Sequence, residues 1–345
     1  MEPNYTEFTN EDLLAEITNR YTINDVSDRL NLCPGTLRRW QELKSVPSNY
    51  RIDLLKILGS DIDYETFSSK DKDQFFTPPD IVARCWDSFI ATGIPLENYT
   101  FIEPSAGDGG FLDVLPVTTI ALDIEPRHRS VVRQDYLTWR PPPGNYIVFG
   151  NPPFGLRGHL ALQFINHSHS FADYVCFILP QLFESDGKGS PRKRVNGFNL
   201  IHSEKLTGMF YTPEQTTVEV NGVFQIWSKH EVNEEYLIHE QDNSLCKVYS
   251  MSDGGTVATT RNKGLIDKCD IYLPSTCFGK ESMRAYDSFE ELPGRRGYGI
   301  VFRNDREGMI LKCKNIDWGS VSFLSTNSAY NLRTSLIHAQ LSGTS

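Results

Sequence analysis

The feature that most constrains the fold is a series of short, continuous apolar runs in the middle of the chain. These runs cover residues 100–102, 118–122, 146–149 and 174–179. Continuous apolar strands that alternate with helical stretches are typical of a parallel sheet covered on both faces. Ligands of such sheets bind at the carboxyl ends of the strands. We therefore look for chemistry in the segments that directly follow these runs.

A glycine-rich segment, Glu-Pro-Ser-Ala-Gly-Asp-Gly-Gly-Phe, follows the first run at residues 103–111. Glycines let the backbone turn tightly and approach a ligand closely, but such a loop also suits dinucleotides. Glu103 opens the loop, and its carboxylate suits a cationic sulfonium with its amino-acid tail. Asp123 ends the second strand, where it can accept both hydroxyls of a ribose, and Asp135 ends the third. This ordered series of acids favours S-adenosylmethionine as the cofactor.

The most specific motif is Asn151-Pro152-Pro153-Phe154, which follows the third apolar run. An exocyclic amine on an aromatic ring is a poor nucleophile, and two hydrogen-bond acceptors draw its nitrogen toward a tetrahedral geometry. The Asn151 side-chain oxygen and the Pro152 carbonyl can be those acceptors, held in place by the stiff prolines. Phe154 offers a flat face to a base outside the duplex, with stacking worth about 1–3 kcal/mol. The motif predicts methyl transfer to a planar amino nitrogen; the alternative is a proline-rich turn.

Residues 74–230 resemble the amino-methyltransferase family, and specifically DNA adenine-N6 methyltransferases of the gamma arrangement. The segment Gln-Phe-Phe-Thr-Pro-Pro at 74–79 looks like the family's first cofactor-contacting motif. The resemblance implies an α/β fold with a Rossmann-like S-adenosylmethionine-dependent methyltransferase sheet, and the choice of adenine rests on it alone. It implies catalysis by Asn151, Pro152, Pro153 and Phe154, and cofactor contacts from Phe76, Thr77, Pro78, Glu103, Pro104, Ser105, Ala106, Gly107, Asp123, Ile124, Asp135, Tyr136 and Asn151.

The family also places an aromatic side chain on the second face of the flipped base. Phe210 and Tyr211 are the two candidates, and the sequence does not choose between them. Both are also compatible with core positions.

A helical unit is expected at the N-terminus, with Asn10 as the cap of its first helix. Residues 28–40 resemble the helix-turn-helix of phage-repressor-like proteins, because a short break before Pro34 separates two helical stretches. Arg38 and Arg39 would then face DNA, together with Gly35 and Thr36. The alternative is a small helical bundle that contacts protein.

Four segments are expected along the chain. Residues 1–62 form the helix-turn-helix-like domain, 63–74 a polar linker, 75–232 the catalytic domain, and 233–345 a C-terminal mixed or β module. The family's domain order makes the last segment the expected target-recognition domain.

The net charge of −10 argues mildly against nucleic acid, but DNA requires only a local positive surface. Arg192, Lys193 and Arg194 form such a cluster. We expect double-stranded DNA as the substrate and a cognate restriction endonuclease as a partner; the oligomeric state is open. The seven cysteines lack zinc-site spacing and no apolar run is long enough to span a membrane. No metal is expected, and the expected location is the cytoplasm, for a bacterial or phage-encoded protein.

Two other classes of function compete with this prediction. The same tetrapeptide suits other amino groups, namely cytosine N4, ribosomal RNA guanine N2 and protein glutamine. A non-catalytic DNA-binding regulator with a degenerate methyltransferase fold is the second, and the intact tetrapeptide argues against it.

Overall fold

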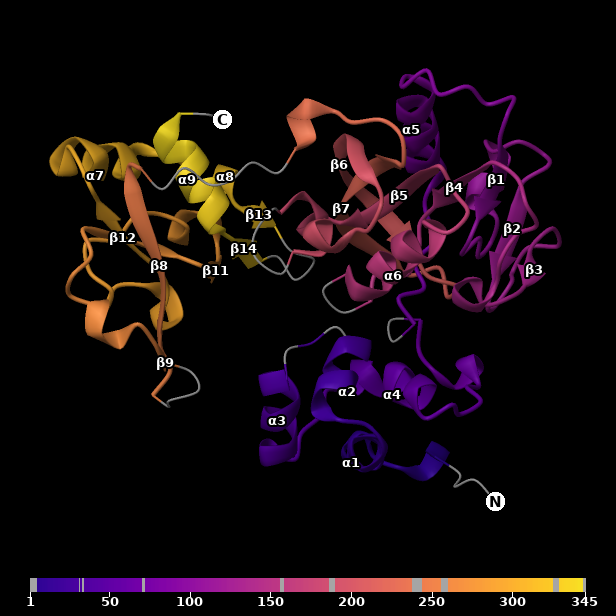
Figure 1. Cartoon of the computed structure of the whole chain (residues 1–345), viewed down its shortest axis with the longest axis horizontal. Helices are drawn as coiled ribbons and strands as arrows, with labels where there is room; N and C mark the ends of the chain where they lie inside the picture. The colour runs from indigo at the N-terminus through magenta and orange to yellow at the C-terminus, as the bar shows by residue number, and fades with distance from the viewer. Residues whose placement is uncertain are drawn as a thin grey trace.

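The computed structural model describes residues 5–30, 32, 34–69, 72–155, 158–185, 190–237, 244–255, 260–324 and 329–343. Figure 1 shows three parts that follow one another along the chain: an N-terminal group of helices, a central sheet, and a C-terminal part with smaller sheets. Asn31 and Cys33, in the expected helix-turn-helix break, lie outside the described residues.

The N-terminal unit contains the helices that the sequence predicts: α1 (Asn10–Arg20), α2 (Ile23–Arg29), α3 (Pro34–Leu43) and α4 (Arg51–Ile57). The expected cap was one residue off, because Thr9 caps α1 in a capping box with Asp12. A second box, between Thr22 and Asp25, starts α2. The helices enclose a core of their own, which includes Leu13, Ile17, Leu37, Trp40 and Leu54.

The central sheet has seven strands in the order β3-β2-β1-β4-β5-β7-β6. Its strands are β1 (Thr100–Glu103), β2 (Ile120–Asp123), β3 (Val132–Arg133), β4 (Tyr146–Gly150), β5 (Tyr174–Pro180), β6 (Asn199–Tyr211) and β7 (Thr217–Ser228). The first five strands in this order are parallel, whereas β7 runs antiparallel to β5 and β6 antiparallel to β7. The carboxyl ends of β1, β2 and β4 therefore meet at one edge.

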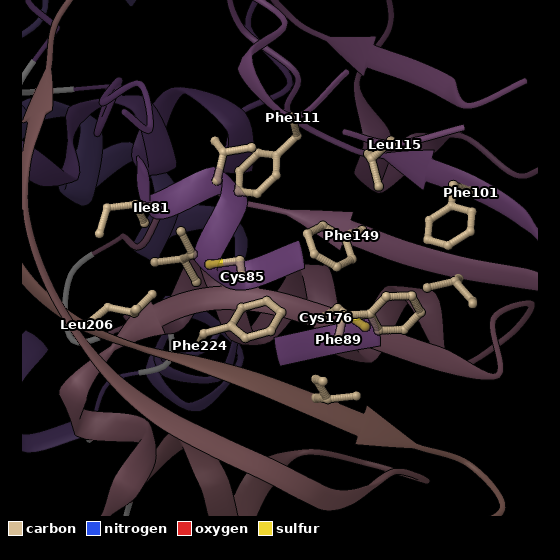
Figure 2. Close-up of a cluster of buried hydrophobic side chains, with 14 of the residues drawn as sticks. Ile81, Cys85, Phe89, Phe101, Phe111, Leu115, Phe149, Cys176, Leu206 and Phe224 are labelled. Atoms are coloured by element: carbon tan, nitrogen blue, oxygen red, sulfur yellow. The ribbon is translucent and has the colours of Figure 1, made fainter. Parts of the chain in front are cut away.

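Helices cover both faces of this sheet, as the apolar runs predict. The helix α5 (Pro79–Ile90) packs on one face, where the rings of Phe89, Phe101, Phe149 and Phe224 meet (Figure 2). The helix α6 (His159–Ser168) packs on the other face against alternate strand residues such as Val148. The crossovers from β1 to β2 and from β3 to β4 contain only short 3-10 turns, η4 (Gly110–Asp113) and η5 (Tyr136–Thr138).

The C-terminal part is a mixed α/β module, as predicted. A four-stranded antiparallel sheet has the order β10-β12-β8-β9, built from β8 (Cys246–Asp253), β9 (Thr260–Arg261), β10 (Ile271–Pro274) and β12 (Arg296–Phe302). A smaller sheet joins β11 (Thr276–Phe278), β14 (Ala329–Asn331) and β13 (Phe323–Leu324). The helices are α7 (Arg306–Asn315), α8 (Trp318–Val321) and α9 (Thr334–Ser342). Trp318, Leu332 and Ile337 belong to the core of this module. Among the described residues, no helix has the length and apolar character to cross a bilayer.

Candidate active site at the carboxyl edge of the sheet

The tetrapeptide that begins at Asn151 leaves the end of β4 and is tied to two neighbouring segments. The side-chain amide of Asn151 donates through Nδ2 to the carbonyl oxygen of Phe75 at 3.2 Å. Ser105 Oγ donates to the Asn151 carbonyl at 3.1 Å. The Nδ2 contact fixes the orientation of the amide, and its other atom, Oδ1, is buried without a hydrogen-bond partner in the described part of the chain. A buried unpaired acceptor is costly, so this oxygen is available to a ligand.

A small hollow of about 20 Å³ opens beside Asn151. Its lining consists of Asp73, Phe75, Asn151, Pro152, Phe154, Phe210 and Val220. Three aromatic residues thus line the hollow together with Asn151, a combination of residue types that suits a planar ring bearing an amino group.

The two aromatic candidates at the end of β6 differ in their surroundings. Phe210 is 1% exposed in the core beneath α5, as the alternative interpretation of the sequence allowed, and it also lines the hollow. Tyr211 instead packs its ring against Phe76, with 5.6 Å between ring centroids, and its hydroxyl donates to Asp108 Oδ2 at 2.7 Å. Burial, followed by this contact with Asp108, raises the pKa of Tyr211 to about 12. Tyr211 thus supports the glycine-rich loop, whereas Phe210 faces the candidate base site.

Glu103 is buried next to the tetrapeptide with no partner for its charge. The residue is 1% exposed, and neither carboxylate oxygen has a hydrogen bond of normal geometry to the described residues. Burial raises the pKa of Glu103 well above its ordinary value; the Ser105 backbone N–H opposes this, and the Asp123 charge adds to it. Gly150 leaves the room for this side chain, because a Cβ there would lie 2.1 Å from Glu103 Oε1.

Asp123 is also buried, but both its oxygens are engaged. They accept hydrogen bonds from the backbone N–H groups of Gly107 at 2.8 Å and Glu125 at 2.7 Å. Burial raises the pKa of Asp123, and these two donors partly oppose the change. Asp123 therefore holds the glycine-rich loop in place. Each oxygen keeps a second lone pair for the ribose contact that the sequence predicts.

The segment after β3 has its polar and aromatic side chains engaged within the protein. Asp135 Oδ1 accepts from the backbone N–H of Leu137 at 2.9 Å and so caps η5. Tyr136 points into the core: it is 1% exposed, and its hydroxyl shares a 2.6 Å hydrogen bond with Ser168 Oγ. Because the ring packs against Phe164 of α6, the cofactor contact predicted for Tyr136 would have to come from its backbone, and it stays a prediction.

The expected cofactor motif at 76–78 lies against the glycine-rich loop. Phe76 pairs with Tyr211 through two backbone hydrogen bonds, of 2.7 and 3.2 Å. A Cβ at Gly107, whose φ is 50°, would lie 2.6 Å from the Phe76 ring. Thr77 is buried, and Pro78 forms the N-cap of α5. The other predicted contacts, Pro104, Ala106 and Ile124, follow β1 and β2 at the same edge; Pro104 and Ala106 are buried and Ile124 is half-buried.

Two residues that the sequence assigned to a linker belong to this site. Lys72 Nζ lies 2.8 Å from Glu125 Oε2, with both side chains nearly buried. Asp73 Oδ2 accepts from the backbone N–H of Gly155 at 2.7 Å. No motif marks these positions; the only available signal was their proximity to the segment 74–79.

The predicted DNA-contacting cations differ in exposure. Arg38 and Arg39 are exposed on α3, but Arg192 and Arg194 are half-buried in η8 (Pro191–Arg194). Arg192 donates to the carbonyl oxygens of Glu184 and Tyr236, and Arg194 donates to that of Ser190. Within this cluster, Lys193 alone is fully exposed. The described residues contain no group of three or more His, Cys, Asp or Glu side chains that could hold a metal ion.

No family model and no curated protein matches this sequence. Several solved structures are distantly similar. A magnesium protoporphyrin IX methyltransferase of Synechocystis PCC 6803 with bound S-adenosylmethionine is 13% identical over 60% of this chain and 96% of its own, with a TM-score of 0.33. The 23S rRNA methyltransferase ErmE is 16% identical over 48% of this chain and 73% of its own, with a TM-score of 0.30. A chain of a type I R-M system is 14% identical over 67% of this chain and 64% of its own, with a TM-score of 0.32.

TM-scores this low do not identify a fold, whereas the strand order of the central sheet does. Five parallel strands in the order β3-β2-β1-β4-β5 are followed by the antiparallel β7 and by β6 (Figure 1). The glycine-rich loop follows β1, an acid ends β2, and the tetrapeptide follows β4. This strand order, with its reversed seventh strand, is that of the Rossmann-like class I S-adenosylmethionine-dependent methyltransferase fold.

Proposed function

We propose that this protein transfers a methyl group from S-adenosylmethionine to the N6 amino group of adenine in duplex DNA, with the target base turned out of the helix. The observation that carries the proposal is the buried, unpaired Oδ1 of Asn151 beside an aromatic-lined hollow. A buried acceptor in such a place is satisfied by an N–H donor on a planar ligand.

The residues present fit the cofactor that this fold implies. A buried carboxylate without a partner, as at Glu103, is stabilised by a cation. S-Adenosylmethionine carries two positive groups, its sulfonium and its α-ammonium, and when bound it supplies the electrophilic methyl group. Glu103 would hold a cationic part of this ligand, while Asp123 and the backbone of the glycine-rich loop would hold the remainder.

The target amine would be activated by acceptors from the tetrapeptide. Asn151 Oδ1 and the Pro152 carbonyl would each accept one N–H of the amine, which concentrates the lone pair on the opposite side of the nitrogen. Phe154 and Phe210 would pack against the base and exclude water from the hollow. The contact from Asn151 Nδ2 to the Phe75 carbonyl keeps Oδ1 in its orientation before any ligand arrives.

One feature favours DNA over RNA and protein substrates, and a second favours adenine over cytosine. The N-terminal unit has the short α2–α3 arrangement of a helix-turn-helix, with Arg38 and Arg39 exposed on α3. The similarity of the motif order to gamma-class enzymes favours adenine over cytosine. A partner endonuclease and a bacterial or phage origin belong to this same proposal.

Transfer of labelled methyl groups tests the substrate. Purified protein incubated with methyl-labelled S-adenosylmethionine and duplex DNA should give N6-methyladenine after digestion to nucleosides. The same assay with ribosomal RNA, a glutamine-containing peptide or cytosine-only targets should give no product. Label found only in one of those acceptors would reject the DNA adenine proposal and identify the correct class.

Asn151→Ala tests the site itself. This variant loses the buried acceptor, so we expect a fall in kcat of about 100- to 1000-fold with cofactor binding retained. The matched control is Asn145→Ala, an exposed loop residue before β4 whose Nδ2 makes only a 3.4 Å contact with the Asn98 carbonyl. Turnover of Asn151→Ala within a few fold of the control would assign the tetrapeptide a structural role.

A further inference from the structure

Asp73 holds the residue that ends the tetrapeptide loop. Its Oδ2 accepts a hydrogen bond of 2.7 Å from the backbone N–H of Gly155. Its own backbone has a φ of 50°, a left-handed conformation that residues other than glycine seldom adopt. Such conformations persist where surrounding contacts enforce them, and they concentrate at functional sites. The chain thus bends at Asp73 in a way that aims the carboxylate at Gly155.

The same short segment holds the other end of the tetrapeptide. Phe75, two residues after Asp73, accepts through its carbonyl from Asn151 Nδ2. Lys72, the residue before Asp73, forms a nearly buried ion pair with Glu125, which lies two residues after β2. Residues 72–75, which we call the strap, are therefore attached through Lys72 to the segment after β2. Their Asp73 and Phe75 accept hydrogen bonds from Gly155 and Asn151, the two ends of the tetrapeptide loop.

Asp73 is also part of the hollow for the target base, beside Asn151, Phe154 and Phe210. Two consecutive prolines stiffen the chain between Asn151 and Gly155, so a displacement at Gly155 is transmitted to Asn151 Oδ1 and to the Phe154 ring. Misplacement by about 1 Å can lower a rate by about 100-fold.

We propose that Asp73 is a positioning residue for methyl transfer: its hydrogen bond to Gly155 sets the orientation of the tetrapeptide toward the target amine. The role rests on the proposed function for its activity readout, but the hydrogen bond can be tested without any substrate. An acceptor at this position is required, and its negative charge is not.

Hydrogen exchange tests the contact in the ligand-free protein. Asp73→Ala should speed exchange of the Gly155 amide by at least 10-fold, whereas Asp73→Asn, whose side-chain oxygen can accept the same bond, should leave it within about 3-fold. The control is Asp61→Ala, an exposed aspartate in the polar segment before the strap. Unchanged exchange in Asp73→Ala would show that this bond does not hold the loop and would overturn the inference.

Kinetics test the consequence. Asp73→Ala should lower kcat about 30- to 100-fold while the dissociation constant of S-adenosylmethionine changes less than about 3-fold, and Asp73→Asn should recover most of the rate. Equal loss in both variants would mean that the charge matters and would overturn the positioning role. If Asp73→Ala fails to fold, the comparison of Asp73→Asn with wild type still decides this point. If the wild-type protein methylates no DNA, the proposed function fails, while the exchange result stands separately.

Discussion

At the scale of single residues, Glu103 is a carboxylic acid that the fold has removed almost completely from water. Its carboxyl group is fully enclosed, the Ser105 backbone N–H is the group that favours its charge, and the charge that acts on it, that of Asp123, has the same sign. Folding therefore favours the protonated form of Glu103. A positively charged ligand would favour the ionised form instead. The protonation of Glu103 therefore links the stability of the ligand-free protein to its affinity for the cofactor.

Glu103→Gln should stabilise the protein without ligand and prevent its stabilisation by the cofactor. The folded pKa of Glu103 lies above its unfolded value of 4.5. Stability that depends on this group is thus full at low pH and declines as the pH rises through the folded pKa. The variant has no such decline, so its gain in melting temperature over wild type should be near zero at pH 4 and grow toward pH 8. Thermal unfolding at several pH values measures this gain; the exposed Glu97→Gln is the control.

The affinity of the wild-type protein for S-adenosylmethionine should change in the opposite direction. Because the ligand pairs with the charged carboxylate, the affinity should rise with pH and binding should release protons. Calorimetric titration in two buffers of different ionisation enthalpy counts these protons. Proton uptake, or an affinity that falls as the pH rises, would contradict the proposed role of Glu103.

The sequence predicted where residues lie in the fold at the positions that a motif fixes. Glu103, Asp123 and Asn151 all lie at the carboxyl edge, because a parallel sheet aligns the ends of its strands. The sequence did not reveal that the Tyr136 ring lies in the core, because a position next to Asp135 says nothing about side-chain direction after a two-residue strand. No sequence motif points to Asp73, because its proposed role depends on its left-handed backbone and on a hydrogen bond with Gly155, 82 residues away.

At the scale of secondary-structure elements, the apolar runs predicted the ends of β1, β2, β4 and β5 to within about two residues. They did not predict the hairpin of β6 and β7. The strand β6 carries charged and polar residues, including His202, Glu204 and Lys205, and its burial alternates imperfectly. Such a strand has neither the continuous apolar pattern of a buried parallel strand nor a clean period of two. Its position became clear only through its pairing with β7, which neighbours β5.

The helix α3 is the element on which the proposed contact with DNA depends. Arg38→Ala with Arg39→Ala should lower the affinity for duplex DNA and reduce the slope of log affinity against log salt by about 2, since each phosphate contact contributes about 0.9. The kcat at saturating DNA should remain within about 2-fold. Fluorescence anisotropy over a range of salt measures the slope, with the exposed Lys56→Ala on α4 as the control. An unchanged slope would favour the protein-contacting role for this unit.

At the scale of the whole molecule, the described residues form separate hydrophobic cores. One fills the N-terminal helices, two large ones and a small one pack against the central sheet, and two lie in the C-terminal module. Polar contacts join the N-terminal unit to the central part; Asp53 on α4, for example, pairs with His159 of α6 at 3.6 Å. A cleft of about 260 Å³ separates the sheet from the C-terminal module, and both sides contribute polar side chains, among them Glu184, Lys205 and Lys280.

Separate cores predict separate unfolding transitions in the intact chain, because cooperativity requires shared packing. S-Adenosylmethionine should raise the midpoint of one transition, that of the central sheet. Trp318→Ala removes a fully buried ring from the C-terminal core and should lower a different transition, at a cost of about 3–5 kcal/mol. Phe149→Ala, in the core of the sheet, should lower the transition that the cofactor shifts. Scanning calorimetry of both variants with and without cofactor distinguishes these outcomes. If Trp318→Ala lowered the cofactor-shifted transition as much as Phe149→Ala does, the C-terminal module and the sheet would unfold as one unit, and the prediction of separate transitions would be wrong.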